Sequence, residues 1–79
     1  MMTNLAKLNE TRTRYNAYIA AEEAVLTGQE YRIGTRLLRR PDLIEIRKMI
    51  DRLYTEIQEL TAQMEGKARR LQGSYTLVD

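Results

Sequence analysis

The side chains of this chain that could do chemistry are carboxylates and the cationic groups of lysine and arginine. The 79 residues include 13 Lys and Arg and 11 Asp and Glu, but no His and no Cys. Disulfide bonds, thiolate zinc sites and imidazole catalysis are therefore excluded. The only serine, Ser74, has no histidine with which to form the common nucleophilic triad.

The carboxylates do not form a catalytic pair. General acid and base chemistry needs titratable groups in a dry pocket, whereas Glu22 and Glu23, as neighbours on a helix, point about 100° apart. The sequence also lacks a phosphate-binding glycine loop and a calcium loop. A chain of this length buries only roughly 60 to 65% of its unfolded surface, which leaves no room for a large enclosed site. We therefore predict a protein that is not an enzyme and that holds no cofactor or metal.

The cationic side chains form two clusters that suit binding. Residues 28–40 carry four Arg and one Glu (net +3), residues 41–65 three basic and six acidic residues (net −3), and residues 66–79 three basic and one acidic residue (net +2). The first cluster is either a solvated basic loop or a contact for an acidic protein surface or nucleic-acid phosphates. The second lies on a tail that is either unstructured or folds onto a partner. The predicted partner-binding residues are Arg32, Arg36, Leu37, Arg39, Arg40, Lys67, Arg69, Arg70, Tyr75 and Leu77.

Two series of residues at heptad spacing predict the architecture that positions these clusters. Both series advance in alternating steps of three and four, which places each along one side of a helix. The short connection makes each helix the nearest partner of the other, so we predict an antiparallel, coiled-coil-like pair within one chain. The first series is Leu5, Leu8, Arg12, Tyr15, Ile19, Glu22 and Leu26, and the second is Leu43, Ile46, Ile50, Leu53, Ile57, Leu60 and Met64.

The segment between the two series predicts a β-hairpin. Residues 29–33 alternate in polarity, and Gly34 followed by Thr35 suits a two-residue turn that needs glycine first. In this register Tyr31 faces Leu38 and Ile33 faces Arg36. Leu37 and Arg32 then share the outer face of the hairpin.

Local signals give the predicted boundaries. Thr3 or Asn4 caps the first helix, which ends at Thr27 and Gly28. Pro41 lies in the first turn of the second helix, which runs to about Glu65, where Gly66 interrupts it. We thus predict an α+β fold with a helix–hairpin–helix domain over residues 1–65 and a flexible tail over residues 66–79. With neither a signal peptide nor a run of roughly 20 apolar residues, we expect a cytoplasmic protein without a membrane span.

Antiparallel pairing fixes which residues of the two helices should face each other. When Leu26 meets Leu43, facing positions sum to about 69, so Glu22 falls opposite Arg47. Arg12 falls near Ile57, within reach of Glu56 and Glu59. These opposite charges predict a polar device that sets the register of the pair. The alanines of the first helix are expected on its outer side, where they either favour helix formation or admit another chain closely: Ala6, Ala17, Ala20, Ala21 and Ala24.

One run of this sequence resembles the gpW-like head-to-tail joining proteins of phages and prophages. The resemblance rests on residues 20–34, AAEEAVLTGQEYRIG, followed by Arg36, Leu38, Asp42 and Leu43, and it extends over roughly residues 5–64. It also rests on the layout of helix, glycine, short hairpin and helix. The chain departs from the pattern at the start of the second helix, where relatives often have Thr or Ser and this chain has Arg39-Arg40-Pro41.

The resemblance implies a structural role in the virion. Proteins of this family assemble as a ring beneath the portal after DNA packaging, help to retain the genome and form the platform for later connector or tail proteins. The implied partners are the portal protein, joining proteins, further copies of the chain and the packaged DNA. The implied locations are the virion neck and, during assembly, the cytoplasm of the bacterial host.

A second hypothesis remains open from the sequence. The chain would then be a small coiled-coil adaptor or nucleic-acid-binding protein whose heptads dimerise between chains. Sedimentation separates the two, because a compact monomer supports pairing within the chain and an elongated tight dimer supports pairing between chains.

Overall fold

The fold is described here from a computed structural model, which defines residues 3–72 and the side chains of residues 3–66. The elements are α1 (Asn4–Leu26), β1 (Tyr31–Ile33), β2 (Arg36–Leu38), the 3-10 turn η1 (Arg40–Asp42) and α2 (Leu43–Gln72). The two helices pack against each other and are joined by an antiparallel two-stranded hairpin. This confirms the predicted α+β helix–hairpin–helix architecture.

Capping groups fix both ends of α1. The Thr3 hydroxyl oxygen accepts a hydrogen bond of 3.0 Å from the amide of Ala6, which satisfies one of the free amides of the first turn. At the other end the amides of Gly28 and Gln29 donate back to the carbonyls of Val25 and Ala24, at 3.1 and 2.8 Å. This is a Schellman closure, and Gly28 adopts the positive φ of 84° that it requires. Both predicted helix ends are confirmed.

The β-hairpin has the predicted register. Tyr31 pairs with Leu38, Arg32 with Leu37 and Ile33 with Arg36. Gly34 has a φ of 60°, a conformation that costs other residues energy. Because β-strand side chains alternate, this register directs Leu38 and Ile33 toward the helices, where Leu38 is fully buried.

The second helix is longer than the sequence indicated. Pro41 lies in η1, and the carboxylate of Asp42 accepts from the amide of Arg39 at 2.9 Å, so η1 serves as the cap of α2. The helix then continues through Gly66 to Gln72, and the prediction that Gly66 interrupts it is wrong. A glycine inside a helix costs only about 1 kcal/mol relative to alanine, which the turns on either side can outweigh.

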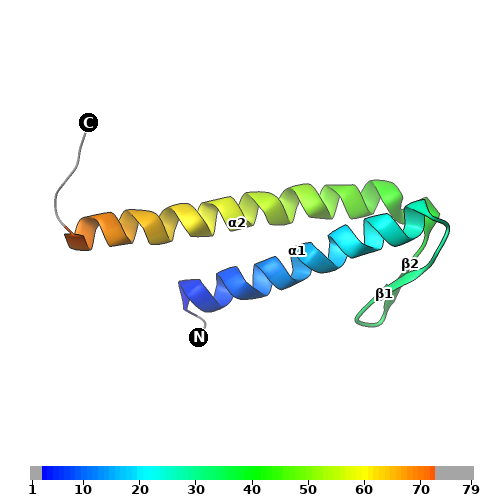
Figure 1. The fold of residues 1–79 in the computed structure, drawn as a ribbon, viewed down its shortest axis with the longest axis horizontal. Helices are drawn as coiled ribbons and strands as arrows, with labels where there is room; N and C mark the ends of the chain where they lie inside the picture. Colours follow the sequence, from blue (N-terminus) through cyan, green and yellow to red (C-terminus); the bar gives the residue numbers. More distant parts are fainter. Residues whose placement is uncertain (1–2, 73–79) are drawn as a thin grey trace.

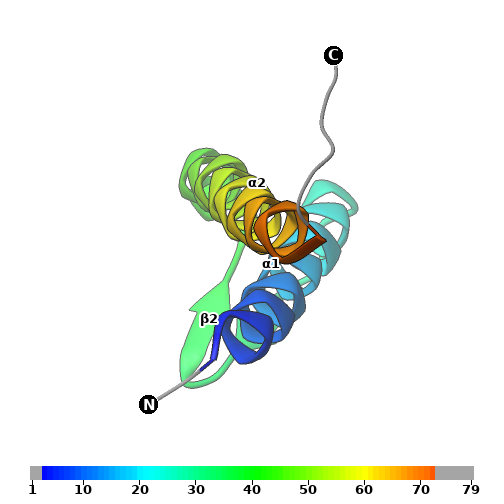
Figure 2. The same ribbon diagram turned by 90° about the vertical axis from the view of Figure 1, so that its left-hand side faces the viewer.

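The hairpin packs on one side of the helix pair, at one end of it. Figure 1 shows α1 beneath α2 with the hairpin at the end where α1 stops and α2 begins, and Figure 2 shows the helices crossing at an angle with the hairpin on one side only. We call this the hairpin end, and the opposite end, where α1 begins, the distal end. The main core lies at the hairpin end and consists of Ala21, Val25, Leu38 and Ile46.

The first helix is rotated relative to the sequence prediction. Ala21, expected on the outer side, is 0% exposed, whereas Leu5 and Leu26, expected against α2, are 54% and 42% exposed. Thr11 takes the buried place next to Leu8 and satisfies its hydroxyl by donating to the carbonyl of Lys7 at 2.7 Å. The rotation follows from the hairpin, because α1 must cover Leu38 as well as α2.

The second helix uses the predicted series. Ile46 and Leu53 are buried, and the other five members, Leu43, Ile50, Ile57, Leu60 and Met64, are half-buried. The ring centroids of Tyr15 and Tyr54 lie 6.2 Å apart across the helix pair. Their residue numbers sum to 69, so this contact agrees with the predicted antiparallel register.

Candidate functional site

The basic cluster of the hairpin end is largely paired within the chain. Arg36 reaches from β2 to α2, where its guanidinium group binds the Glu45 carboxylate through both terminal nitrogens, one of them at 2.6 Å. The hydrogen bond and charge of Arg36 lower the pKa of Glu45, and those of Glu45 raise the pKa of Arg36. This bidentate pair connects the hairpin to the second helix.

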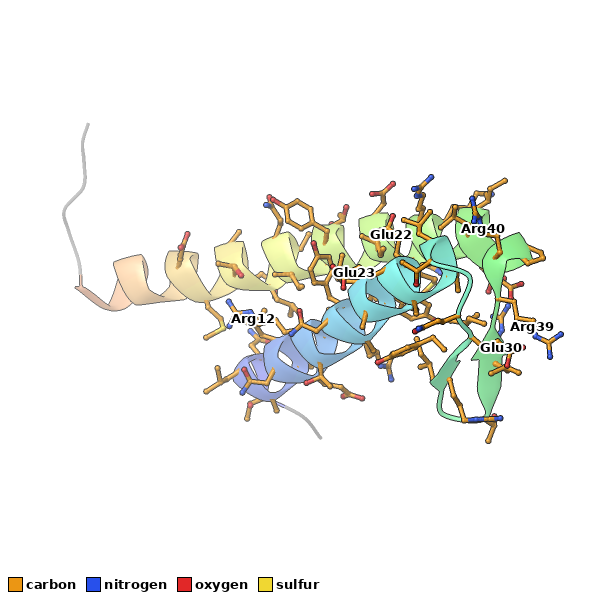
Figure 3. All side chains as sticks on the ribbon, turned by 45° about the vertical axis from the view of Figure 1, so that its right-hand side comes forward. Arg12, Glu22, Glu23, Glu30, Arg39 and Arg40 are labelled. Carbon is orange, nitrogen blue, oxygen red and sulfur yellow. The ribbon has the colours of Figure 1, made fainter. Side chains whose placement is uncertain are left out.

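The two arginines before Pro41 are engaged in different ways. Arg39 forms an ion pair of 2.8 Å with Glu30, and Figure 3 shows the two side chains next to each other at the base of the hairpin, apart from Arg40. The guanidinium of Arg40 lies 3.5 Å from the carbonyl oxygen of Leu26. A cation disfavoured at the start of α2 is thus favourable at the negative end of α1.

One arginine of the cluster has no such partner. Arg32 is exposed on the outer face of the hairpin and forms no ion pair with any residue that the structure describes. Its cross-strand neighbour Leu37 is half-buried. Among the predicted partner-binding residues of the hairpin, Arg32 and Leu37 are therefore the pair best placed for an outside contact.

The second predicted cluster is described only in part. Lys67, Arg69 and Arg70 belong to α2, and their side chains lie outside the described residues. Tyr75 and Leu77 lie outside the described residues altogether. In the observed register Asn4 is level with Glu65, so residues 66–72 extend α2 by about two turns past the start of α1. Figure 1 shows this overhang.

One of the two predicted polar register contacts is present. Arg47 donates to the Glu22 carboxylate at 2.9 Å across the helix pair. Arg12 is exposed and forms no ion pair within residues 3–66, so the predicted contact with Glu56 and Glu59 is wrong. The rotation of α1 gives the inward place to Thr11 and moves Arg12 away.

A groove that the sequence did not indicate lies between the helices at the distal end. It has a volume of about 290 Å³, just below the roughly 300 to 1,000 Å³ of small-molecule sites. Thr11 and Leu60 are its more buried members, and the ion pair between Arg14 and Glu10 lies within it. We call it the distal groove, and it is lined by Lys7, Glu10, Thr11, Arg14, Glu56, Glu59, Leu60 and Gln63.

Two further findings concern the described residues as a whole. Within them, no group of three acidic side chains is arranged to hold a metal ion. No helix of this part of the chain is long and apolar enough to cross a membrane. Large apolar side chains are nevertheless exposed at Ile44 (73%) and Tyr54 (51%), in addition to Leu5 and Leu26.

Comparison with known proteins places the chain in a family without assigning an activity. No significant match was found to a curated protein or to a solved structure. Residues 2–79, almost the whole chain, match a family described as a family of unknown function, DUF6148. The chain therefore belongs to the DUF6148 family.

Proposed function

We propose that this chain is a structural protein of the phage or prophage head-to-tail connector. It binds the portal protein after DNA packaging and forms the platform for the next joining protein. The observation that carries the proposal is the order of elements: a helix closed by glycine, a hairpin with a two-residue turn and a second helix. This is the layout of the gpW-like proteins that the sequence resembles.

The proposed setting is the virion neck, where several copies surround the channel beneath the portal. Before assembly the protein resides in the cytoplasm of the bacterial host. The basic ends of the chain then face acidic portal surface or packaged DNA, which a positive surface attracts without reading its sequence.

The outer face of the hairpin is the proposed portal contact. Arg36 and Arg39 are held by Glu45 and Glu30, so neither contributes a free charge. Arg32 has no ion partner in residues 3–66 and can meet a carboxylate on the portal, and Leu37 beside it adds apolar surface. An arginine suits this role because its planar group binds carboxylates with two parallel hydrogen bonds.

Binding to the portal protein encoded in the same genome tests the proposal. The purified chain is mixed with assembled portal rings at low salt, and bound protein is measured by cosedimentation. Arg32→Gln is expected to weaken binding by roughly two- to fivefold, the worth of one exposed ion pair. Arg12→Gln, which removes another exposed arginine without an ion partner in residues 3–66, serves as the matched control.

The outcome that contradicts the proposal is equally clear. Absence of binding to portal rings at low salt removes it. Binding that Arg32→Gln and Arg12→Gln weaken equally keeps the portal as partner but removes the hairpin as the contact. Binding to DNA alone, with an affinity that falls steeply with salt, favours the nucleic-acid-binding alternative instead.

A further inference from the structure

We propose that this chain binds a second copy of itself head to tail, through an exposed isoleucine at the hairpin end of one copy and the distal groove of the next. This contact deepens the self-association within the proposed function by naming its two surfaces. Both surfaces are present in the same chain, and they are complementary in charge.

Ile44 is the most exposed of the large apolar side chains in the described residues, at 73%. On α2 the residues three and four positions after Ile44 are its surface neighbours, and both are cationic: Arg47 and Lys48. Of the residues three and four positions before it, in η1, Pro41 is uncharged and Arg40 is cationic. Arg40 also brings the half-exposed Leu26 next to this surface, through its contact with the Leu26 carbonyl. We call Ile44, Leu26, Arg40, Arg47 and Lys48 the Ile44 patch.

The charge of the Ile44 patch is only partly neutralised within the chain. Glu22 binds Arg47, and Glu45, the acidic neighbour of Ile44, is occupied by Arg36. Arg40 and Lys48 form no ion pair with any described residue. The patch is therefore an apolar projection with a positive rim, and it fits a recess with a negative rim.

The distal groove is such a recess. Its α2 wall carries Glu56 and Glu59, neither of which has an ion partner in residues 3–66, beside the half-buried Leu60. On its α1 wall Arg14 and Glu10 neutralise each other, and Lys7 is the remaining cation, without an ion partner in residues 3–66. The groove thus has a net charge of −1, and its volume of about 290 Å³ suits one or two side chains.

The placement of the two surfaces dictates the kind of assembly. Ile44 and Leu60 are 16 residues apart on one helix, which separates them by roughly 24 Å along the axis and about 160° around it. The exposed groove residues Glu56, Glu59 and Gln63 lie about 60 to 120° around the axis from Ile44, so a head-to-tail contact joins two different surfaces of neighbouring copies. Each copy therefore uses its Ile44 patch on one neighbour and its distal groove on another, as in a ring or filament.

Sedimentation velocity of the full-length chain without any partner tests this contact. The weight-average mass is expected to rise with protein concentration and to fall with added salt, because the contact is small and partly ionic. Ile44→Glu places a carboxylate opposite Glu56 and Glu59 and is expected to lower the association constant at least about tenfold. Ile44 is exposed, so the variant should fold, and circular dichroism checks this.

A charge exchange identifies the two surfaces as partners. Lys48→Glu alone and Glu59→Lys alone should each weaken association, and an equal mixture of the two variants should restore it. Where the two variants alternate, positions 48 and 59 carry opposite charges at every contact, either as in the native chain or with the signs exchanged. Arg12→Glu makes the same change in net charge as Lys48→Glu at a residue that belongs to neither surface, and it is expected to leave association unchanged.

Three results would overturn the contact. One is a chain that stays monomeric at every concentration, and another is an association that Ile44→Glu does not weaken. The third is a mixture of Lys48→Glu and Glu59→Lys that associates no better than either variant alone. None of these measurements involves the portal, so failure here leaves portal binding standing, and failure of portal binding leaves this contact standing.

Discussion

The two ends of the helix pair bury the same series of apolar residues to different degrees. At the hairpin end Ile46 is fully buried, because α1, α2 and the hairpin meet there and Leu38 fills the space between the helices. At the distal end Ile57, Leu60 and Met64 are only half-buried, because α1 alone faces them. Leu43 and Ile50 of the hairpin end are half-buried as well, so the third element completes the burial of Ile46 in particular rather than of every residue at this end.

The two ends also differ in whether their glutamates form ion pairs. Glu30 and Glu45 of the hairpin end have arginine partners, whereas Glu56 and Glu59 of the distal end have none in residues 3–66. The hairpin end therefore holds the fold together. The distal end keeps surface available for contacts.

The largest expected effect is the difference in lost stability between two leucine truncations, one at each end of the helix pair. Leu38→Ala empties a fully buried site where three elements meet and should lower the free energy of unfolding by about 2 to 5 kcal/mol. Leu60→Ala at the half-buried distal end should cost roughly 1 kcal/mol, in proportion to the smaller area it buries. Urea unfolding measures both, and equal losses would refute the difference between the ends.

The next largest effect concerns the side of α1 that the hairpin covers. Ala21→Leu adds three carbon atoms where the side chain is completely enclosed, so overpacking should cost about 1 to 3 kcal/mol. Ala17→Leu, one turn earlier and half-buried, should change stability by less than about 0.5 kcal/mol. The thermal midpoint of each variant gives the measurement. A neutral Ala21→Leu would mean that the hairpin does not cover this side of α1.

Replacing each of two glycines with alanine should change the free energy of unfolding in opposite directions. Gly28→Ala forces a positive φ of 84° on a residue with a side chain and should cost about 1 to 2 kcal/mol. Gly66→Ala, inside α2 at the distal end with open space around it, should stabilise by up to about 1 kcal/mol. Chemical denaturation of both variants tests this, and loss of stability in Gly66→Ala would contradict the continuous helix.

The smallest effect is the pH dependence of stability that arises from the ion pair between Arg36 and Glu45. Folding lowers the pKa of Glu45 from its ordinary value near 4.5. Between the folded and unfolded pKa values, the unfolded chain therefore binds more protons than the folded chain. The ion pair thus contributes its full stability above pH 4.5. This contribution is lost as the pH falls through the lower pKa that Glu45 has in the folded chain. NMR titration of the Glu45 carboxyl carbon measures that pKa. In Arg36→Gln the pKa of Glu45 should return toward 4.5.

Much of the fold could be predicted from neighbouring residues alone. The turn at Gly34 and the alternation around it determined the hairpin register, because turn type and strand periodicity are local properties. The caps at Thr3 and Gly28 determined the ends of α1 for the same reason. The α2 series identified its buried side, since its apolar residues all gather on one face.

The site was less predictable, because its contacts join residues from different elements. Four clustered arginines indicated a basic surface, but only the packed hairpin brings Glu45 to Arg36 and leaves Arg32 without an ion partner among the described residues. The distal groove had no signal in the sequence. It forms where the rotated α1 presents Lys7 and Thr11 to α2.

Short-range periodicity and single turns were enough to define the order of the elements, the hairpin register and the buried face of α2. Tertiary structure decided the rotation of α1. That helix carries two apolar series of similar strength, so its own pattern favours neither. Covering Leu38 and Ile46 together buries more apolar surface than facing α2 alone, and this turned Ala21 and Val25 inward and left Leu5 and Leu26 exposed.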